Sequence, residues 1–305
     1  MPGRATAPLR GGRAAEPGAG RLTITHVSDT ARWVAVYRAM ESERPDALFR
    51  DPFARRLAGP EGERIVTAMP RGRAMAWAMI VRTAVFDGLI LDCVARRGVT
   101  RVVNLAAGLD ARPWRLALPA SLTWVDVDFP DVLAYKAGAI GAAPAACRYR
   151  AEGVDLTDLA ARAALRERLR AEGGRTLVVT EGLLIYLEPA QVAELGRDLA
   201  ADRADAFWLI DLASPLLLQW MQRSWGRAVA AGNAPFRFAP EQGLDFFRPL
   251  GWTPAEVRWS SDESHRLGRE MRLMWLWRLL GRLYSKERRE RFRRMSAFVL
   301  LQRES

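Results

Sequence analysis

The chain has 305 residues, of which 50% are hydrophobic and 27% are charged, a balance that is typical of a folded globular protein of one or two domains and excludes a disordered one. The net charge of +11 is concentrated in residues 1–21 (+3) and 266–294 (+8), so the body between them is neutral, and we expect no nucleic-acid partner, because a nucleic-acid enzyme would spread its basic residues over the binding face. Two cysteines are too few for a disulfide framework, and with only two histidines beside them no metal site is expected. The sequence has no signal region and no apolar run of roughly 20 residues, so we expect a soluble cytoplasmic protein.

The first hundred residues predict a tail followed by helices. Residues 1–21 are rich in Gly, Pro, Ala and Arg and have little to bury, so we expect a disordered basic tail. A helix is expected to begin near Ser28, where Ser28 and Asp29 can cap it. Its apolar residues recur at helical spacing: Trp33, Val36, Tyr37 and Met40. A longer helix is predicted over residues 73–95, with Gly98 past its end.

From residue 101 onward, strand and helix patterns alternate. Seven stretches are typical of strands: 101–105, 122–126, 147–151, 176–180, 206–211, 255–259 and 296–302. Helical patterns occupy 131–140, 158–171, 189–201 and 214–230. Because strands that alternate with helices build parallel sheets covered on both faces, we predict a doubly wound α/β fold in one domain, residues 22–305. Helical segments at about 22–98, 212–240 and 262–294 are expected to cap the sheet.

The first predicted strand runs into a turn of small residues, with the sequence NLAAGLD at positions 104–110. In doubly wound sheets, ligands bind beyond the carboxyl ends of the strands, and small residues there let a nucleotide-like ligand approach the backbone. Such a turn is often only a turn, so this loop alone does not establish a binding site. The dinucleotide fingerprint needs three glycines, whereas residues 106–111 contain one, which favours a smaller cofactor over NAD.

An acid at the end of the second predicted strand, roughly 20 residues after a glycine turn, is where a ribose is commonly held. Asp126 and Asp128 both fit this description, because residues two apart on a strand point to the same face. Either one could instead be an aspartate that caps the next helix. The residues alone therefore leave the choice open, but they favour a ribose-bearing cofactor.

Five stretches in this order form a more specific pattern: VSDTA at 27–31, DALFRDP at 46–52, the loop at 104–115, VDVDFP at 125–130 with the Tyr135-Lys136 pair, and TEGLLIYL at 180–187. Over residues 26–303 the chain resembles the leucine carboxyl methyltransferase-like S-adenosylmethionine-dependent O-methyltransferases, which include polyketide carboxyl methyltransferases. The resemblance implies a class I, Rossmann-like methyltransferase fold with a mostly parallel seven-stranded sheet. It also implies S-adenosylmethionine as the cofactor.

The resemblance implies cofactor-binding roles for five residues. Arg82 would bind the carboxylate of the cofactor's methionine part, as guanidinium groups do well, and Glu181 would lie beside its amine. Asp128 would bind the ribose, and Asp155 and Leu156 would flank the adenine. From the residues alone, Arg82 fits a solvated helix arginine as well, and Asp155 fits an ordinary turn.

Two further positions depend on their surroundings. Tyr186 matches a family tyrosine near the active site and is the catalytic candidate, with a half-buried core tyrosine as the alternative. The family usually has glycine where Ala106 stands, close to the cofactor, whereas Gly108 is retained. The methyl group of Ala106 is harmless in an extended backbone and costly at positive φ.

The acceptor is predicted from chemistry. A carboxylate is ionised near neutral pH and needs no general base, whereas an alcohol needs one, and the candidates are His26, His265, Tyr186 or an acid. We therefore expect a small-molecule acceptor, hydrophobic or polyketide-like, with a carboxylate or acidic hydroxyl. The alternatives are a protein's C-terminal carboxylate, or cofactor binding without turnover. The neutral body disfavours an RNA methyltransferase, as does EGLL at 181–184, where an Asn/Asp-Pro-Pro-Tyr motif would stand.

The segment MRLMWLWRLL at 271–280 lies inside the basic stretch 266–294 and has three interpretations. The simplest is a cap helix buried in its own domain. The second is a cap over a hydrophobic acceptor pocket. The third is a basic amphipathic helix in weak contact with a membrane surface.

Overall fold

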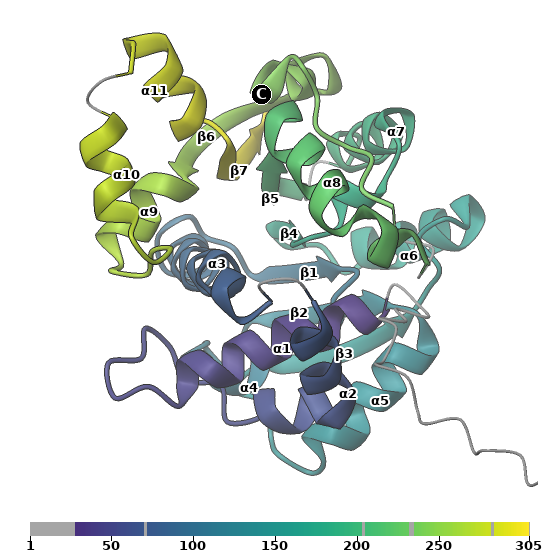
Figure 1. Cartoon of the computed structure of the whole chain (residues 1–305). Coiled ribbons are helices and arrows are strands. Elements are labelled where there is room, and N and C mark those ends of the chain that lie inside the picture. The colour runs from purple at the N-terminus through teal and green to yellow at the C-terminus, as the bar shows by residue number, and fades with distance from the viewer. Residues whose placement is uncertain (1–27, 70–71, 203–204, 232–234, 282–283, 305) are drawn as a thin grey trace, which may run out of the picture.

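Seven strands form one twisted sheet in this computed structural model, which describes residues 28–69, 72–202, 205–231, 235–281 and 284–304 (Figure 1). The strand order is β3-β2-β1-β4-β5-β7-β6. The bounds are β1 (Arg101–Leu105), β2 (Thr123–Asp128), β3 (Arg148–Gly153), β4 (Thr176–Thr180), β5 (Asp205–Ala213), β6 (Trp252–Trp259) and β7 (Ser296–Arg303). Neighbours from β3 to β5 pair in parallel, and β7 is antiparallel to β5 and β6. The predicted doubly wound, mostly parallel seven-stranded sheet is confirmed.

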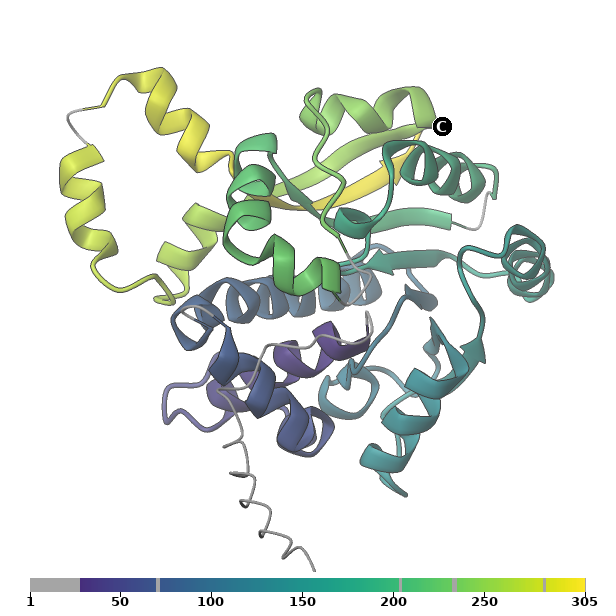
Figure 2. The same cartoon turned by 45° about the vertical axis from the view of Figure 1, so that its right-hand side comes forward.

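Helices cover both faces of this sheet (Figures 1 and 2). Their bounds are α1 (Ser28–Ser42), α2 (Ala54–Ala68), α3 (Ala76–Arg96), α4 (Arg112–Arg115), α5 (Pro130–Ile140), α6 (Leu159–Ala171), α7 (Pro189–Ala200), α8 (Pro215–Ala231), α9 (Ser260–Arg266), α10 (Met274–Gly281) and α11 (Lys286–Arg293). Three short 3₁₀ helices are η1 (Arg73–Met75), η2 (Leu184–Tyr186) and η3 (Gly243–Leu250). The predicted strand and helix boundaries lie within three residues of the observed ones, and those of β1 and β4 match at both ends.

The alternation of side chains along the strands explains this two-sided arrangement. Val102 of β1 lies in a core cluster with Phe86 of α3, whereas Val103 lies in a second cluster with Leu165 of α6 and Val192 of α7. Successive strand residues point to opposite faces, so a strand that is buried on both sides must be apolar throughout.

The N-terminal helices form a third core cluster beside the sheet. Trp33, Val36 and Tyr37 of α1 are buried there against α2, as the helical spacing predicted. The predicted caps of this helix, Ser28 and Asp29, and the tail of residues 1–21 lie outside the side chains that the structure describes. Gly98 has a φ of +68° just past α3, consistent with its predicted role as a helix stop.

The chain order of the strands creates a switch point in the middle of the sheet. From β1 the chain moves outward through β2 to β3, and then it returns to the other side of β1 as β4. The connections that leave β1 and β4 therefore diverge at their carboxyl ends, which is where doubly wound sheets bind ligands.

Helices α10 and α11 project from one edge of the molecule (Figures 1 and 2). The interpretation of residues 271–280 as a helix buried in its own domain is wrong, because the side chain of Trp275 is 65% exposed. Only one side of α10 faces the rest of the described chain. None of the helices in the described ranges is both long enough and apolar enough to cross a bilayer.

Candidate functional site

One large cavity lies at the carboxyl ends of β1, β2, β4 and β5, beside the switch point. Its volume is about 1480 Å³, which exceeds the roughly 300–1,000 Å³ of an ordinary small-molecule site and leaves room for a cofactor and an acceptor together. All eight predicted site residues line it: Arg82, Ala106, Gly108, Asp128, Asp155, Leu156, Glu181 and Tyr186.

The turn after β1 approaches the cavity with its backbone in an unusual conformation. Ala106 has a φ of +53° and Gly108 a φ of +51°. The backbone at Ala106 is therefore not extended but left-handed, and a side chain in that region costs about 1–2 kcal/mol. Gly108 has a second reason to be glycine, since a Cβ there would lie 3.1 Å from the Cβ of Ala31.

This strain gives a testable expectation for Ala106→Gly. Glycine removes the left-handed penalty but adds about 0.5–1 kcal/mol of backbone entropy to the unfolded chain, so we expect a net stabilisation of about 0.5–1 kcal/mol. The melting temperature should rise by about 1–3 °C in differential scanning calorimetry. The control is Ala107→Gly at the neighbouring residue, whose φ is not positive and which should lose stability instead. A lower melting temperature for Ala106→Gly would contradict the strain argument.

The structure separates the two aspartates that the sequence left open. Asp126 is fully buried and accepts hydrogen bonds from Lys136 Nζ at 2.5 Å and Trp124 Nε1 at 2.9 Å, so it stabilises the core. Asp128 lines the cavity and accepts hydrogen bonds from the backbone N–H groups of Gly108 and Phe129, each at 2.7 Å. Burial raises the pKa of Asp128 above its ordinary value. Asp128 is therefore the acid that a bound ligand can reach.

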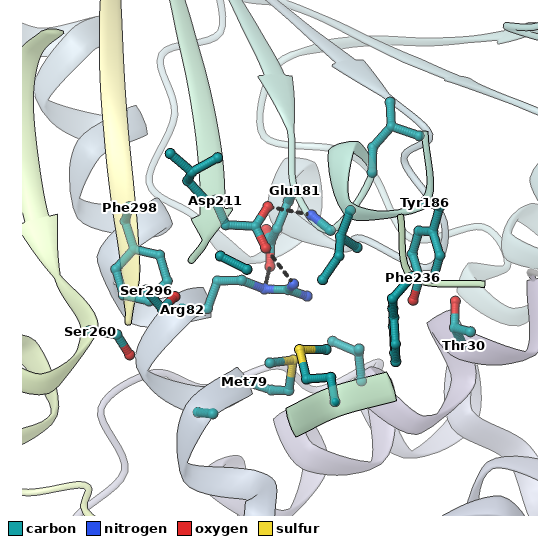
Figure 3. A pocket seen from close by; sticks show the side chains of 18 of the residues that line it. Thr30, Met79, Arg82, Glu181, Tyr186, Asp211, Phe236, Ser260, Ser296 and Phe298 are labelled. Atoms are coloured by element: carbon teal, nitrogen blue, oxygen red, sulfur yellow. Dashed lines mark hydrogen bonds and ion pairs between the residues drawn. The ribbon is translucent and has the colours of Figure 1, made fainter. Parts of the chain in front are cut away.

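Arg82 is held between two carboxylates in the middle of the cavity wall (Figure 3). Its Nε lies 3.0 Å from Glu181 Oε1, and its Nη1 donates to Asp211 Oδ2 at 3.0 Å. Its side chain is only 11% exposed, which excludes the alternative of a solvated helix arginine. Asp211, at the carboxyl half of β5, was not singled out from the sequence, although an acid near the end of a buried strand gives the same signal as Glu181.

Gly182 lets Arg82 and Asp211 come together. Its φ is +68°, and a Cβ there would lie 2.9 Å from Arg82 Nη1. Its backbone N–H donates to Asp211 Oδ1 at 2.7 Å. A side chain at this position would therefore strain the turn and displace the guanidinium.

A buried network of ion pairs holds the second carboxylate oxygen of Glu181, the one that does not face Arg82. Arg112 Nη1 lies 2.7 Å from Glu181 Oε2, and Arg112 Nε donates to Asp87 Oδ1 at 2.6 Å. Asp87 of α3 also accepts two hydrogen bonds from Arg115, at 2.6 and 2.7 Å. Although burial alone would raise the pKa of Asp87, the two guanidinium groups hold it below its ordinary value. Ion pairs thus fix Glu181 from two sides, Arg82 and Arg112.

Tyr186 and the aromatic residue beside it form another part of the wall. The Tyr186 ring stacks on Phe236 with ring centroids 5.7 Å apart, and its hydroxyl pairs with that of Thr30 (Figure 3). Burial raises the pKa of Tyr186 to about 12. The phenol is therefore protonated near neutral pH and does not act as a base there. The sequence left a half-buried core tyrosine and an active-site tyrosine as alternatives. Tyr186 is half-buried, and it also lines the cavity.

Asp155 and Leu156 lie at the far end of the cavity from α10. Asp155 Oδ1 accepts hydrogen bonds from the backbone N–H and the hydroxyl of Thr157, at 2.8 and 2.7 Å. This is the turn that the sequence allowed as an alternative, and the same residue also lines the cavity. Leu156 packs against the core cluster below α6 and α7.

The cavity continues from Arg82 towards α9 and α10 with a mainly apolar lining. Its apolar residues there come from separate segments: Met75, Met79, Leu217, Trp220, Met221, Met271, Met274 and Phe298. Polar residues also line this end: Ser260 and Ser296 add hydroxyl groups (Figure 3), and Asp262, Glu270, Arg289 and Arg293 add charged groups. His265 also lines this end, whereas His26 lies outside the described residues. The prediction that the 271–280 segment covers a hydrophobic pocket therefore agrees with the inner side of α10.

The sequence model of the leucine carboxyl methyltransferase family matches residues 31–200. A protein of Mycobacteroides abscessus named "Putative S-adenosyl-L-methionine-dependent methyltransferase" is 44% identical over 183 residues, which are 56% of this chain and 58% of that protein. The match to this relative thus spans less than two thirds of its length. A protein of Mycolicibacterium gilvum with the same name is 34% identical over 257 residues, 74% of this chain and 82% of the relative.

Solved structures share the fold. The crystal structure of a DUF574 family protein from Streptomyces avermitilis has a TM-score of 0.59 at 13% identity, and the match covers 90% of this chain and 97% of that one. A second structure, from Thermobifida fusca, has a TM-score of 0.57 at 14% identity and is covered over 94% of its length. Both support the class I methyltransferase-like arrangement of the sheet.

Proposed function

Because the chain belongs to the leucine carboxyl methyltransferase family of S-adenosylmethionine-dependent methyltransferases, we propose that it methylates a carboxylate on a small hydrophobic acceptor. The proposal has two parts, which rest on different residues. The cofactor part rests on the charged wall around Arg82, and the acceptor part rests on the apolar end of the cavity.

The charges around Arg82 suit the zwitterionic end of an amino acid. A methionine moiety carries a carboxylate and an ammonium group on one carbon, so its site needs a cation and an anion side by side. Arg82 Nε and Glu181 Oε1 are 3.0 Å apart, and both residues line the cavity. We assign Arg82 to the carboxylate and Glu181 to the amine, and Asp211 and Arg112 hold the two in place.

The remaining cofactor contacts follow the order of the strands. Asp128 has a carboxylate suited to accept hydrogen bonds from two ribose hydroxyls, and its position is fixed by two backbone N–H groups. Asp155 and Leu156 follow β3 and would flank the adenine, with Leu156 supplying the apolar side. Ala106 and Gly108 would let the backbone approach the cofactor.

The observation that carries the choice of a carboxylate acceptor is that both acids beside Arg82 are engaged. Glu181 is paired with two guanidinium groups, and Asp211 accepts from Arg82 and Gly182. Tyr186 is protonated near neutral pH. An acceptor that is already ionised needs no base, whereas an alcohol would have to use one of these engaged groups or His265, which lines the α9 end of the cavity with a side chain that is 68% exposed.

The protein's contribution to such a transfer is mainly alignment. S-adenosylmethionine supplies, when bound, a methyl group on a positively charged sulfur. The apolar walls from Met79, Phe236 and Phe298 exclude water and orient the acceptor's hydrocarbon part. Tyr186 is our candidate for the residue that touches the acceptor, as a hydrogen-bond donor that holds its carboxylate.

Removing either cofactor acid should weaken binding. We expect Asp128→Ala and Glu181→Ala each to reduce the affinity for S-adenosylmethionine by about 1–3 kcal/mol, the loss of a charged hydrogen bond. Isothermal titration calorimetry measures this, with NAD as the ligand that should not bind the parent protein. A folded variant with unchanged affinity would remove that residue from the cofactor site.

The kind of bond formed distinguishes the acceptor classes. With labelled S-adenosylmethionine and aromatic or polyketide-like carboxylic acids, we expect a methyl ester, which mild alkali cleaves to methanol. Methylation of a hydroxyl gives an ether that survives alkali. Labelling only of the matched alcohols would overturn the carboxylate proposal, and labelling only of peptide C-termini would favour a protein acceptor. Cofactor binding with no product from any class would support binding without turnover.

A further inference from the structure

The outer face of α10, together with Leu273 just before the helix, exposes large apolar side chains to solvent. Leu273 is 59% exposed, Trp275 65% and Leu279 51%, with Leu276 and Leu280 beside them. In the described part of the chain, every other exposed large apolar side chain lines the cavity: Phe129, Leu159, Trp220 and Phe292. The face on α10 therefore lies apart from the cavity and calls for its own explanation.

The spacing of these residues gives α10 two apolar sides. Leu276, Leu279 and Leu280 follow Trp275 by one, four and five residues, which places all four on one helical face. Met274 lines the cavity on the other side. An apolar helix face is normally buried, yet this face of α10 is exposed to solvent, on a helix that projects from the rest of the molecule (Figures 1 and 2).

The same projection is strongly basic. Residues 266–294 carry eleven cationic side chains and three acidic ones. Five of the exposed cations form no ion pair with any carboxylate in the described ranges: Arg272, Lys286, Arg288, Arg289 and Arg291. Four of these belong to α11, directly after the apolar face in the chain. Unpaired cations and exposed apolar groups thus share one projection, residues 272–294, which we call the basic arm.

We infer that the basic arm docks on an anionic membrane surface. An anionic lipid layer offers acyl chains to the Trp275–Leu279 face and phosphates to the cations of α11, and each cation near such a surface contributes about 1 kcal/mol. A second copy of the chain would meet the apolar face with an equally cationic arm, which like-charge repulsion disfavours. Because Met271 and Met274 of this region also line the cavity, docking would bring the apolar end of the cavity to the lipid.

Vesicle flotation tests this inference without requiring turnover, so it is independent of the proposed acceptor. With phosphatidylcholine vesicles that contain phosphatidylserine, we expect the full chain to float, and to float less as salt rises. Pure phosphatidylcholine vesicles should bind it at least about tenfold more weakly. Two double variants probe the arm: Lys286→Glu with Arg291→Glu for charge, and Trp275→Gln with Leu279→Gln for the apolar face. Each should reduce partitioning by about tenfold or more.

The matched control lowers the net charge by the same amount as the charge variant, but at a site far from the basic arm. Arg148→Glu with Arg170→Glu alters two exposed arginines on β3 and α6 and should leave partitioning within about twofold of the parent. Binding of S-adenosylmethionine in calorimetry shows that each variant is folded. The inference fails if the parent chain does not float, or if this control weakens flotation as much as the arm variants do. It also fails if the parent is a dimer in solution that Trp275→Gln with Leu279→Gln separates.

Discussion

Replacing Arg82 by methionine should lower the affinity for S-adenosylmethionine by about 3 kcal/mol or more, a loss of roughly a hundredfold or greater. The substitution removes the cation that we assign to the methionine carboxylate. It also leaves Glu181 and Asp211 facing each other without the guanidinium between them. Like charges in a partly buried site repel strongly, so both the site geometry and the fold should suffer. Calorimetric titration and urea unfolding measure the two effects separately.

Arg115→Met provides the control for a buried arginine that does not reach the cavity. The Arg115 side chain is more buried than that of Arg82 and pairs with Asp87, but it does not line the cavity. We expect this variant to lose stability and to keep its affinity for the cofactor within a few-fold. Arg82→Lys should bind the cofactor more tightly than Arg82→Met but less tightly than the parent. Lysine keeps the positive charge, but it lacks the paired N–H donors of the guanidinium group. Equal affinities for the parent and Arg82→Met would remove Arg82 from the cofactor site.

Replacing Asp87 by asparagine should lower the free energy of unfolding near pH 7 by about 3–5 kcal/mol. Asp87 is a buried carboxylate that holds Arg112 and Arg115 with three hydrogen bonds. Without its charge, two guanidinium groups remain buried with less compensation. Urea unfolding followed by circular dichroism measures the change. Asp92→Asn on the same helix is the control, because Asp92 pairs with Arg96 and Arg97 but is partly exposed, and its replacement should cost only about 1 kcal/mol.

The pH dependence of stability follows from the same carboxylate. The pKa of Asp87 is lower in the folded protein than its ordinary value. Its contribution is therefore fully present above the pKa of an unfolded aspartate, about 4, and is lost as the pH falls below it. The parent should lose stability between about pH 5 and pH 3 more steeply than Asp87→Asn does. Parallel curves for the two proteins would contradict this account.

Local patterns were sufficient to predict the sheet. Strand 101–105 is apolar at nearly every position because both of its faces are covered, and alternation with helices indicates parallel pairing. Trp33, Val36 and Tyr37 showed the helical period that α1 buries. These are short-range signals, and they predicted the doubly wound arrangement by themselves, whereas the mostly parallel, seven-stranded form was implied by the family resemblance.

The site needed information that short-range patterns do not contain. Arg82 is one of many arginines in the chain, and only the resemblance to a family distinguished it before its contacts with Glu181 and Asp211 were visible. The φ of Ala106 depends on how the turn crosses the end of the sheet, so the sequence could state the two outcomes but not choose between them. Asp211 was hidden inside a predicted strand, since its importance comes from a partner 129 positions earlier.

The exposed face of α10 shows a different limit. A segment as rich in Trp, Met and Leu as 271–280 is normally buried, and the simplest interpretation followed that rule. The rule concerns how much apolar surface a chain hides, and it does not specify which neighbour hides it. In this fold the sheet is already covered by α3 and α9 on that side, so one face of α10 has no described segment to pack on.

The cavity is divided along the chain in a way that bears on how such enzymes diversify. The seven residues that we assign to the cofactor, and Tyr186, all lie between residues 31 and 200, the part that the family model matches. Most of the apolar lining beyond Arg82 comes from residues 217–298, outside that part. Substitutions within residues 217–298 can therefore reshape the part of the cavity that we assign to the acceptor, while the residues that we assign to the cofactor, and Asp211 that holds Arg82, stay unchanged. Related enzymes with this fold can therefore accept different substrates while they keep the same residues for binding the methyl donor.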